Sequence, residues 1–257
     1  MTPPPRFNVL GVGVHALTLA SARDQVIAAA RAGPPRLVCC CDVNSICSAR
    51  RDARHRSILN RAFLTTPDGM PLVWLGRRAG HKDIQRVYGP DLLLAVAAAT
   101  AATGHRHYFC GAGPGTASLL ATTLGLRFPG LTIAGTETPP FGEFSDAALD
   151  AIATRIRAAQ ADIIWIGLST PRQEALMAAL APRLERGVLL GVGAAFDLLS
   201  GRIRQAPPFV RRSGLEWLWR LIREPRRLGP RYLRNGPLFL SLIAGQLSGM
   251  KRFSVDE

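Results

Sequence analysis

The chain has 257 residues, and 47% of them are hydrophobic, which suits one α/β domain with an appendage and excludes a chain that is disordered throughout. Its formal net charge of +14 indicates an anionic partner: nucleic acid, anionic lipid or a phosphorylated substrate. The five cysteines form no CxxC pair, which argues against a zinc site or a disulfide scaffold, so we expect no metal. No signal peptide is visible, and no apolar run reaches the roughly 20 residues of a spanning helix, so we expect a cytoplasmic protein that is soluble or peripheral.

Apolar β-like runs alternate with helix-like segments along most of the chain. The patterns predict strands at residues 7–14, 36–43, 63–66, 107–111, 131–134, 162–167 and 188–192. They predict helices at residues 18–31, 45–62, 71–78, 89–103 and 116–127, one opening at 145, and one at 171–184. This alternation indicates an α/β fold with a parallel, doubly wound sheet, whose continuous apolar strands are covered by helices on both faces.

A basic segment begins near residues 201–208. From Arg202 to Arg234 the chain has ten arginines against two glutamates. We therefore divide the chain into a domain of residues 1–201 and a C-terminal appendage of residues 202–257.

The appendage is expected to contain an amphipathic helix with an apolar and a charged face. The apolar side chains are Leu215, Leu218, Trp219 and Ile222, and the charged ones are Glu216, Arg220 and Arg223. Either the apolar face packs on the chain's own domain, or tryptophan beside arginine marks a membrane interface. Pro225 is expected to interrupt this helix, and a second apolar stretch follows at 238–247.

Ligands of parallel sheets bind at the carboxyl ends of the strands, so the loops that follow the strands are the candidates for a site. The first is FCGAGPGT, in which Gly111, Ala112 and Gly113 form a glycine-rich turn before a helix. Such a turn offers backbone N–H groups to an anion, but it is neither GxGxxG nor a Walker A loop. The sequence leaves open whether this turn binds phosphate or only packs as a tight turn.

A second loop, IGLSTPRQE, places Ser169, Thr170 and Arg172 at the start of a helix, and Gln173 and Glu174 in its first turn. The Gln173 amide could bond to a sugar or a base, while Glu174 could serve only the helix N-terminus.

Two further loops hold charged candidates. Asp68 lies in TPDGMP, where a carboxylate is either a general base in a cleft at a strand end or a local turn former. Arg86 lies in RVYGPD, where it meets a phosphate or merely solvent.

Taken in order, PDGMPLVW, RVYGPDL, FCGAGPGTA, IGLSTPRQE, GVGAAFD and GLEWLWRLIREPRRL closely resemble the motifs of the WecG/TagA/CpsF glycosyltransferases, glycosyltransferase family 26. The resemblance runs from about residue 7 to about residue 232. It implies a Rossmann-like fold of the GT-E type, and inverting, metal-independent transfer from a UDP-sugar to a polyprenyl-diphosphate-linked saccharide. It also implies work in cell-surface or exopolysaccharide biosynthesis on the inner face of the cell membrane, with an appendage that helps to target the enzyme there.

The resemblance assigns roles to several residues. Asp68 matches the candidate base, and Gln173 lies near the catalytic pocket. Asp197 and the Gly111–Gly113 turn lie where the nucleotide is expected, and we add Ser169, Thr170, Arg172 and Arg86 to this substrate-binding set. The arginines expected at the diphosphate or the membrane are Arg220, Arg226, Arg227 and Arg231.

The chain departs from the family pattern at two places. The family's Thr-x-Asn falls at Cys40 and Asp42, with Asn44 two residues on, so one of these three is expected to replace the substrate-contacting threonine. The arginine of the family's Arg-Ala-Pro is Gln205 here, which puts any role of that arginine in doubt.

Two rival functions rest on other features. The charge alone would suit a nucleic-acid-binding protein, but the chain has no nucleic-acid module, so we expect no nucleic-acid partner. A nicotinamide-dependent oxidoreductase would suit the fold class, but GxGxxG is absent, and we expect no cofactor. The sequence identifies neither the donor sugar nor the acceptor. It also leaves the oligomeric state open, and a homo-oligomer is one of the alternatives.

Overall fold

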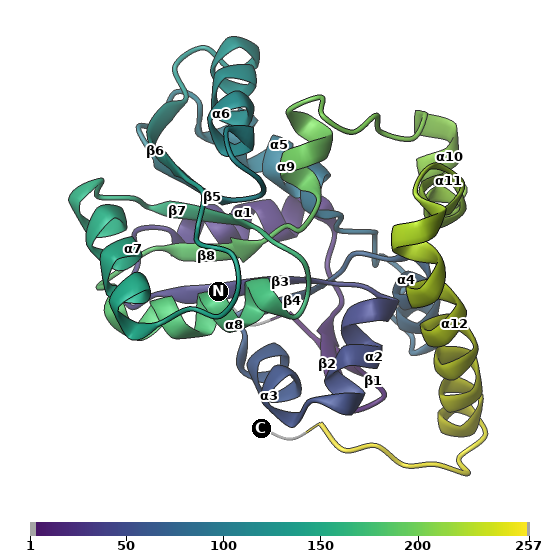
Figure 1. Ribbon diagram of the computed structural model, residues 1–257. Coiled ribbons are helices and arrows are strands. Elements are labelled where there is room, and N and C mark those ends of the chain that lie inside the picture. The colour runs from purple at the N-terminus through teal and green to yellow at the C-terminus, as the bar shows by residue number, and fades with distance from the viewer. Residues whose placement is uncertain (1–3, 256–257) are drawn as a thin grey trace.

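The computed structural model describes residues 4–255, apart from the side chains of Pro208, Arg212 and Arg227. Its centre is a six-stranded parallel sheet in the order β4-β3-β8-β7-β5-β6 (Figure 1). The strands are β3 (Arg36–Cys41), β4 (Leu64–Pro67), β5 (Arg106–Gly111), β6 (Thr132–Glu137), β7 (Ile163–Gly167) and β8 (Val188–Gly191). The predicted α/β fold with a parallel sheet is confirmed.

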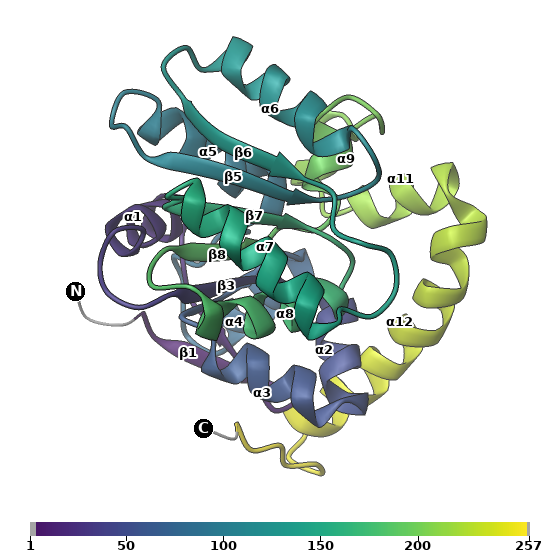
Figure 2. The same ribbon diagram turned by 60° about the vertical axis from the view of Figure 1, so that its left-hand side comes forward.

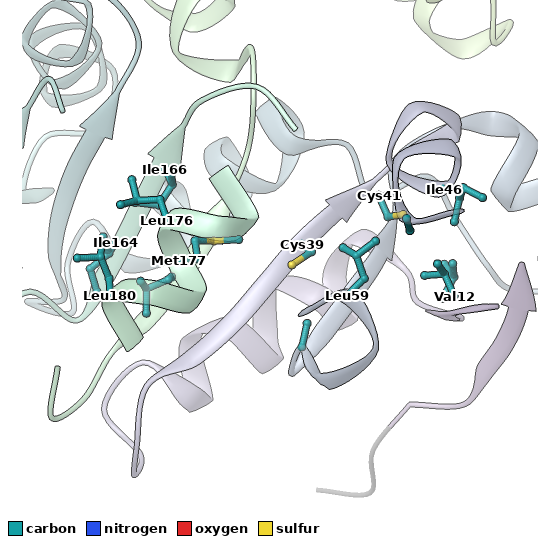
Figure 3. Packing of buried hydrophobic residues seen from close by; sticks show 14 of the residues in the cluster. Val12, Cys39, Cys41, Ile46, Leu59, Ile164, Ile166, Leu176, Met177 and Leu180 are labelled. Atoms are coloured by element: carbon teal, nitrogen blue, oxygen red, sulfur yellow. The ribbon is translucent and has the colours of Figure 1, made fainter. Parts of the chain in front are cut away.

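Helices cover both faces of this sheet (Figures 1 and 2). One face packs against α1 (Leu19–Ala29), α5 (Gly89–Thr100), α6 (Thr116–Arg127) and α9 (Ala195–Leu199). The other packs against α2 (Val43–Arg51), α3 (Ala53–Arg61), α7 (Asp146–Ala158) and α8 (Arg172–Leu180), with a short 3₁₀ turn at Ala181–Arg183. The residues of β3 alternate between the two cores, since Cys39 and Cys41 pack with Leu59 and Met177 (Figure 3) while Cys40 faces the opposite core.

The N-terminal run is a hairpin rather than the single strand predicted at residues 7–14. β1 (Arg6–Val9) and β2 (Val12–His15) pair antiparallel in a sheet of their own. The turn between them, Leu10 and Gly11, has positive φ at both residues (53° and 88°), as the common two-residue hairpin turn requires. The apolar pattern continues through the turn because Leu10 is itself buried, so the pattern conceals the reversal.

The helix predicted at 45–62 is two helices joined at Asp52. The N–H of Asp52 closes α2 on the carbonyl of Ser48, and its carboxylate accepts from the N–H groups of Arg54 and His55 to open α3. One residue thus ends one helix and caps the next. After β4, α4 (Met70–Arg78) lies beside β1.

The C-terminal region consists of α10 (Pro208–Arg212), α11 (Glu216–Arg223) and α12 (Pro225–Leu247). Pro225 starts α12, a position that suits proline, and the helix continues through Pro230 and Pro237. Phe239 and Ile243 join the core on the α2 side of the sheet, and both figures show α12 running beside α2. None of the helices between residues 4 and 255 has the length and apolarity that crossing a bilayer requires. The division of the chain after residue 201 stays a prediction.

A histidine is buried in the middle of the sheet. The indole N–H of Trp165 donates to Nδ1 of His107 over 3.0 Å, and Nε2 lies 2.9 Å from the hydroxyl of Thr100. Both ring nitrogens therefore have partners when the imidazole is neutral. Burial lowers the pKa of His107 to about 4.

We predict that His107 makes the fold sensitive to mild acid. Because its pKa is about 4 when folded and about 6.5 when unfolded, the unfolded state binds the extra proton, and roughly 2 kcal/mol of stability is lost between pH 7.5 and pH 5. Urea unfolding at both pH values should show a smaller pH-dependent loss for His107→Phe than for the wild type. An equal pH-dependent loss in both proteins would contradict the assignment.

Candidate active site

Asp68 and Asp42 follow two adjacent strands. Cys41 of β3 is in register with Pro67 of β4, and the N–H of Asp68 continues the pairing with a 2.9 Å bond to the carbonyl of Cys41. A Cβ built on Gly69 would lie 3.9 Å from the Cβ of Asp42. The carboxyl edge of the sheet therefore carries two carboxylates side by side, at the place where parallel sheets bind ligands.

The guanidinium of Arg86 lies against the Asp68 loop. Its Nε donates to the Asp68 backbone carbonyl, one terminal nitrogen lies 3.6 Å from the Asp68 carboxylate, and the other lies 2.8 Å from the carboxylate of Glu216. The guanidinium also lies 4.1 Å from the centre of the Tyr88 ring, whose hydroxyl donates to Glu216 over 2.6 Å. These four residues form one polar cluster, which we call the Asp68 cluster.

The pKa of the Asp68 carboxyl lies close to neutral pH. Burial raises its pKa most, Arg86 lowers it, and the nearby charges of Asp42 and Glu216 raise it again, to a value of about 7. A carboxyl with this pKa exists in both protonation states at neutral pH. It can therefore take a proton from a substrate and release it to solvent.

Glu216 is a member of the site that the sequence analysis did not identify. The sequence pattern places it on the charged face of its helix, opposite the apolar face, yet it is only 5% exposed, whereas Leu215 is 48% and Ile222 is 69% exposed. Of the two alternatives for the apolar face, packing on the domain does not hold for Leu215 and Ile222. The available signal was the position of Glu216 as one of two carboxylates among ten arginines, inside the GLEW motif.

Further contacts dock the start of the appendage on the sheet domain. The guanidinium of Arg211 pairs with Asp91 at the start of α5 over 3.1 Å. Gly214, at a φ of +78°, approaches α4 so closely that a Cβ there would lie 3.1 Å from Cγ of Met70. α10 and α11 are thus held over the Asp68 loop from two sides.

The side chains of Gln173 and Thr170 form hydrogen bonds within the protein. The Gln173 carbonyl accepts from the N–H of Gly193 over 2.9 Å, and its amide donates to Glu174 over 2.9 Å. The Thr170 hydroxyl donates to the same Glu174 oxygen, and burial raises the pKa of Glu174. These bonds connect the start of α8 with the loop after β8. Because β8 lies two strand positions from β4, this loop is about 10 Å from the loop after β4 at the usual strand spacing. Ser169 is exposed in the same loop.

The three residues at the Thr-x-Asn position lie in different environments. Cys40 is buried, and burial raises the pKa of its thiol, so it stays neutral. Asp42 caps α2 by accepting from the N–H and hydroxyl of Ser45. The amide oxygen of Asn44 accepts from Asn235 of α12 over 2.8 Å. Asn44 thus helps to dock the appendage, a role that the sequence analysis did not predict.

The glycine-rich turn lies at the carboxyl end of β5. Gly111 has a φ of +153° and is so close to Gly167 that a Cβ would lie 2.5 Å from its backbone nitrogen. Ala112 donates to the carbonyl of Gly167, and Gly113 is exposed. α6 begins directly after this turn without a side-chain cap, and the buried hydroxyl of Thr116 has no hydrogen-bond partner. The turn thus presents helix N–H groups in a form that suits an anion.

The remaining candidates are dispersed. Asp197 is partly buried in α9, while Arg172 donates to the carbonyl of Pro140 and lies 4.8 Å from the centre of the Phe144 ring. The Nε atoms of Arg220 and Arg231 are buried without a hydrogen-bond partner, and Arg226 is exposed. The prediction for Arg227 falls outside the described side chains.

We predict that Gln173 is required for stability as well as for the shape of the loop. Gln173→Ala leaves the Gly193 N–H without its partner and should cost about 1–3 kcal/mol in the free energy of unfolding. Ser169→Ala, in the exposed part of the same loop, should change it by less than about 0.5 kcal/mol. Chemical denaturation of both variants measures the difference, and equal effects would show that the buried amide does not stabilise the loop.

Comparison with known proteins places this chain in a family. The N-acetylglucosaminyldiphosphoundecaprenol N-acetyl-beta-D-mannosaminyltransferase of Bacillus spizizenii is 28% identical over 182 residues, which cover 70% of this chain and 68% of the relative. The protein of the same name from Bacillus subtilis (strain 168) is 26% identical over 180 residues, with the same coverage of both chains. The model of the family described as "Glycosyl transferase WecG/TagA/CpsF family" matches residues 7–252. The chain therefore belongs to the WecG/TagA/CpsF family of glycosyltransferases.

Proposed function

We propose that this protein transfers a sugar, with inversion, from a UDP-sugar to a saccharide on a polyprenyl diphosphate, in the synthesis of a bacterial cell-surface or exopolysaccharide. The observation that carries the proposal is the position of the Asp68 carboxyl at the carboxyl edge of the sheet, beside Asp42 and Arg86. The names of the two Bacillus relatives support the lipid-linked acceptor, since both proteins act on N-acetylglucosaminyldiphosphoundecaprenol.

Asp68 is the base of the proposed reaction. Its carboxylate removes the proton of an acceptor hydroxyl while that oxygen forms a bond to the anomeric carbon of the donor. The bond from this carbon to the diphosphate oxygen breaks on the opposite face, and UDP leaves with the electron pair. Attack from the opposite face inverts the anomeric centre, and Asp68 then returns its proton to solvent.

The diphosphate of the leaving UDP needs positive charge around it. The uncapped N-terminus of α6 behind Gly111–Gly113 supplies N–H groups, and Arg220, Arg226 and Arg231 of the appendage supply guanidinium groups. Within residues 4–255, no three His, Cys, Asp or Glu side chains are grouped so as to hold a metal ion. We therefore propose that these donors, without a metal or another cofactor, stabilise the leaving group.

The appendage also supports attachment to the inner face of the cell membrane. Ile222, Leu233 and Leu240 are each at least 66% exposed on α11 and α12, and Arg223, Arg226 and Arg234 are exposed in the same segment. Apolar side chains beside arginines suit the interface of an anionic bilayer. Such a position would bring a lipid-linked acceptor close to Asp68.

The transferase proposal predicts acceptor-dependent release of UDP. Full-length protein is assayed with a panel of UDP-sugars and a short-chain polyprenyl-diphosphate-linked saccharide in EDTA, and one donor should support turnover. Asp68→Asn should lower kcat about 10²- to 10⁴-fold, because the amide cannot accept the proton. Asp83→Asn, at an exposed site, serves as the control. Near-normal turnover by Asp68→Asn would remove Asp68 from the role of base.

The pH profile of the wild type provides an independent prediction. The base acts only when ionised, and the pKa of Asp68 in the substrate-free protein is about 7, so kcat/KM should rise with pH through a midpoint near 7. The measurement is kcat/KM between pH 5.5 and 9. A flat profile across this range would contradict a base with this pKa.

Membrane attachment is tested with vesicles of anionic phospholipid. The double variant Ile222→Glu/Leu233→Glu should weaken cosedimentation tenfold or more, because it removes two apolar side chains, each worth about 1.5–3 kcal/mol when buried. Leu126→Glu is the matched control, since Leu126 is 80% exposed on distant α6. Equal binding by all three proteins would refute attachment through the appendage.

A further inference from the structure

Glu216 reaches the Asp68 cluster from the far end of the sequence. It is the first residue of α11, is buried, and has both carboxylate oxygens engaged, one by the Tyr88 hydroxyl at 2.6 Å and one by Arg86 at 2.8 Å. A buried carboxylate is costly unless it is paired, so these two contacts are the reason that it is tolerated there. The pairing makes the environment of Asp68 depend on the appendage.

The pairing with Glu216 determines the position of Arg86. A guanidinium can close on one carboxylate with two parallel bonds, which is its strongest arrangement. Here it is divided, with the short 2.8 Å contact to Glu216 and a longer 3.6 Å contact to Asp68. The Tyr88 ring against the guanidinium and the bond from Nε to the Asp68 backbone carbonyl hold it in this orientation. The Asp68 carboxylate is therefore left without a close ion pair, and its other partner is the backbone N–H of Gly89.

We propose that Glu216 is a positioning residue, which holds Arg86 away from a closed ion pair with Asp68 and so keeps the Asp68 carboxylate able to accept a proton. The inference rests on the proposed function for its catalytic meaning, but its effect on Asp68 is a property of the folded protein alone.

The charges around Asp68 determine the sign of the effect. The titratable and charged groups that face it are Cys40 and Cys41 of β3, Asp42 directly after β3, Arg86 and Tyr88 from the segment before α5, and Glu216 from α11. Removing the charge of Glu216 withdraws a negative neighbour and frees the positive Arg86. Both changes favour the ionised form of Asp68, so both lower its pKa and make it a weaker base.

The first test is the titration of Asp68 in the full-length protein, followed by NMR of ¹³C-labelled aspartate carboxyl groups. The Asp68 signal is identified by its loss in Asp68→Asn. In Glu216→Gln, which keeps the shape of the side chain, the midpoint should fall by about one pH unit or more. Glu216→Asp, which keeps the charge but shortens its reach, should shift it in the same direction by less and provides a second variant. An unchanged midpoint in both variants would overturn the proposal.

Arg211→Gln is the matched control. Arg211 also ties the appendage to the sheet domain, through Asp91, but it makes no contact with Arg86 or Asp68 among the described interactions. If Glu216 only anchored the appendage, both glutamine variants would move the Asp68 midpoint alike. A shift confined to the Glu216 variants supports the positioning role, and an equal shift in Arg211→Gln contradicts it.

Kinetics then separates this inference from the proposed function. In Glu216→Gln the acidic limb of the kcat/KM profile should move to lower pH and the plateau of kcat should fall several-fold, while KM for the donor stays within about twofold. Arg211→Gln should keep the wild-type midpoint. If the wild type releases no UDP from any donor, the transferase proposal fails, while the NMR titration still decides whether Glu216 governs Asp68.

Discussion

The active site depends on how one guanidinium is shared between two carboxylates. Arg86 belongs to the sheet domain, Asp68 to the loop after β4, and Glu216 to the appendage, and each of the three is largely withdrawn from water. Buried charges that lose a partner are strongly destabilising, so the contact fixes the start of α11 over the sheet edge. The same contact leaves Asp68 without a close ion pair, and its burial then raises the pKa of its carboxyl to about 7.

The parallel sheet explains why the parts of the site lie where they do. All strands end at one edge, so loops from distant parts of the sequence are brought into one row there. Asp68 follows β4 at one side of this row, and the glycine-rich turn follows β5 four strand positions away. The bonds of Gln173 to Gly193 and Glu174 hold the middle of the row rigid.

The appendage combines two properties that would conflict in an ordinary amphipathic helix. It buries a carboxylate against the sheet domain and exposes much of its apolar surface. α12 is anchored separately, since Asn235 bonds to Asn44 of α2, and Phe239 and Ile243 enter the core. The docked side is therefore held by polar contacts near the site and by apolar contacts farther along. The outward apolar side chains remain available to a membrane.

The sequence by itself determined the α/β fold, most strand positions, the starts of the helices near residues 18 and 145, and the family, because these follow from local patterns and from motifs in series. Local patterns could not reveal the turn at Leu10–Gly11, because the buried leucine continues the apolar run. Nor could they show that Asn44 bonds to Asn235, or that Glu216 is buried beside Arg86. Those contacts join residues more than a hundred positions apart, and only the packing of the C-terminal helices on the sheet decides them. Helical periodicity predicts which side chains share a face, but the tertiary structure determines which face is buried.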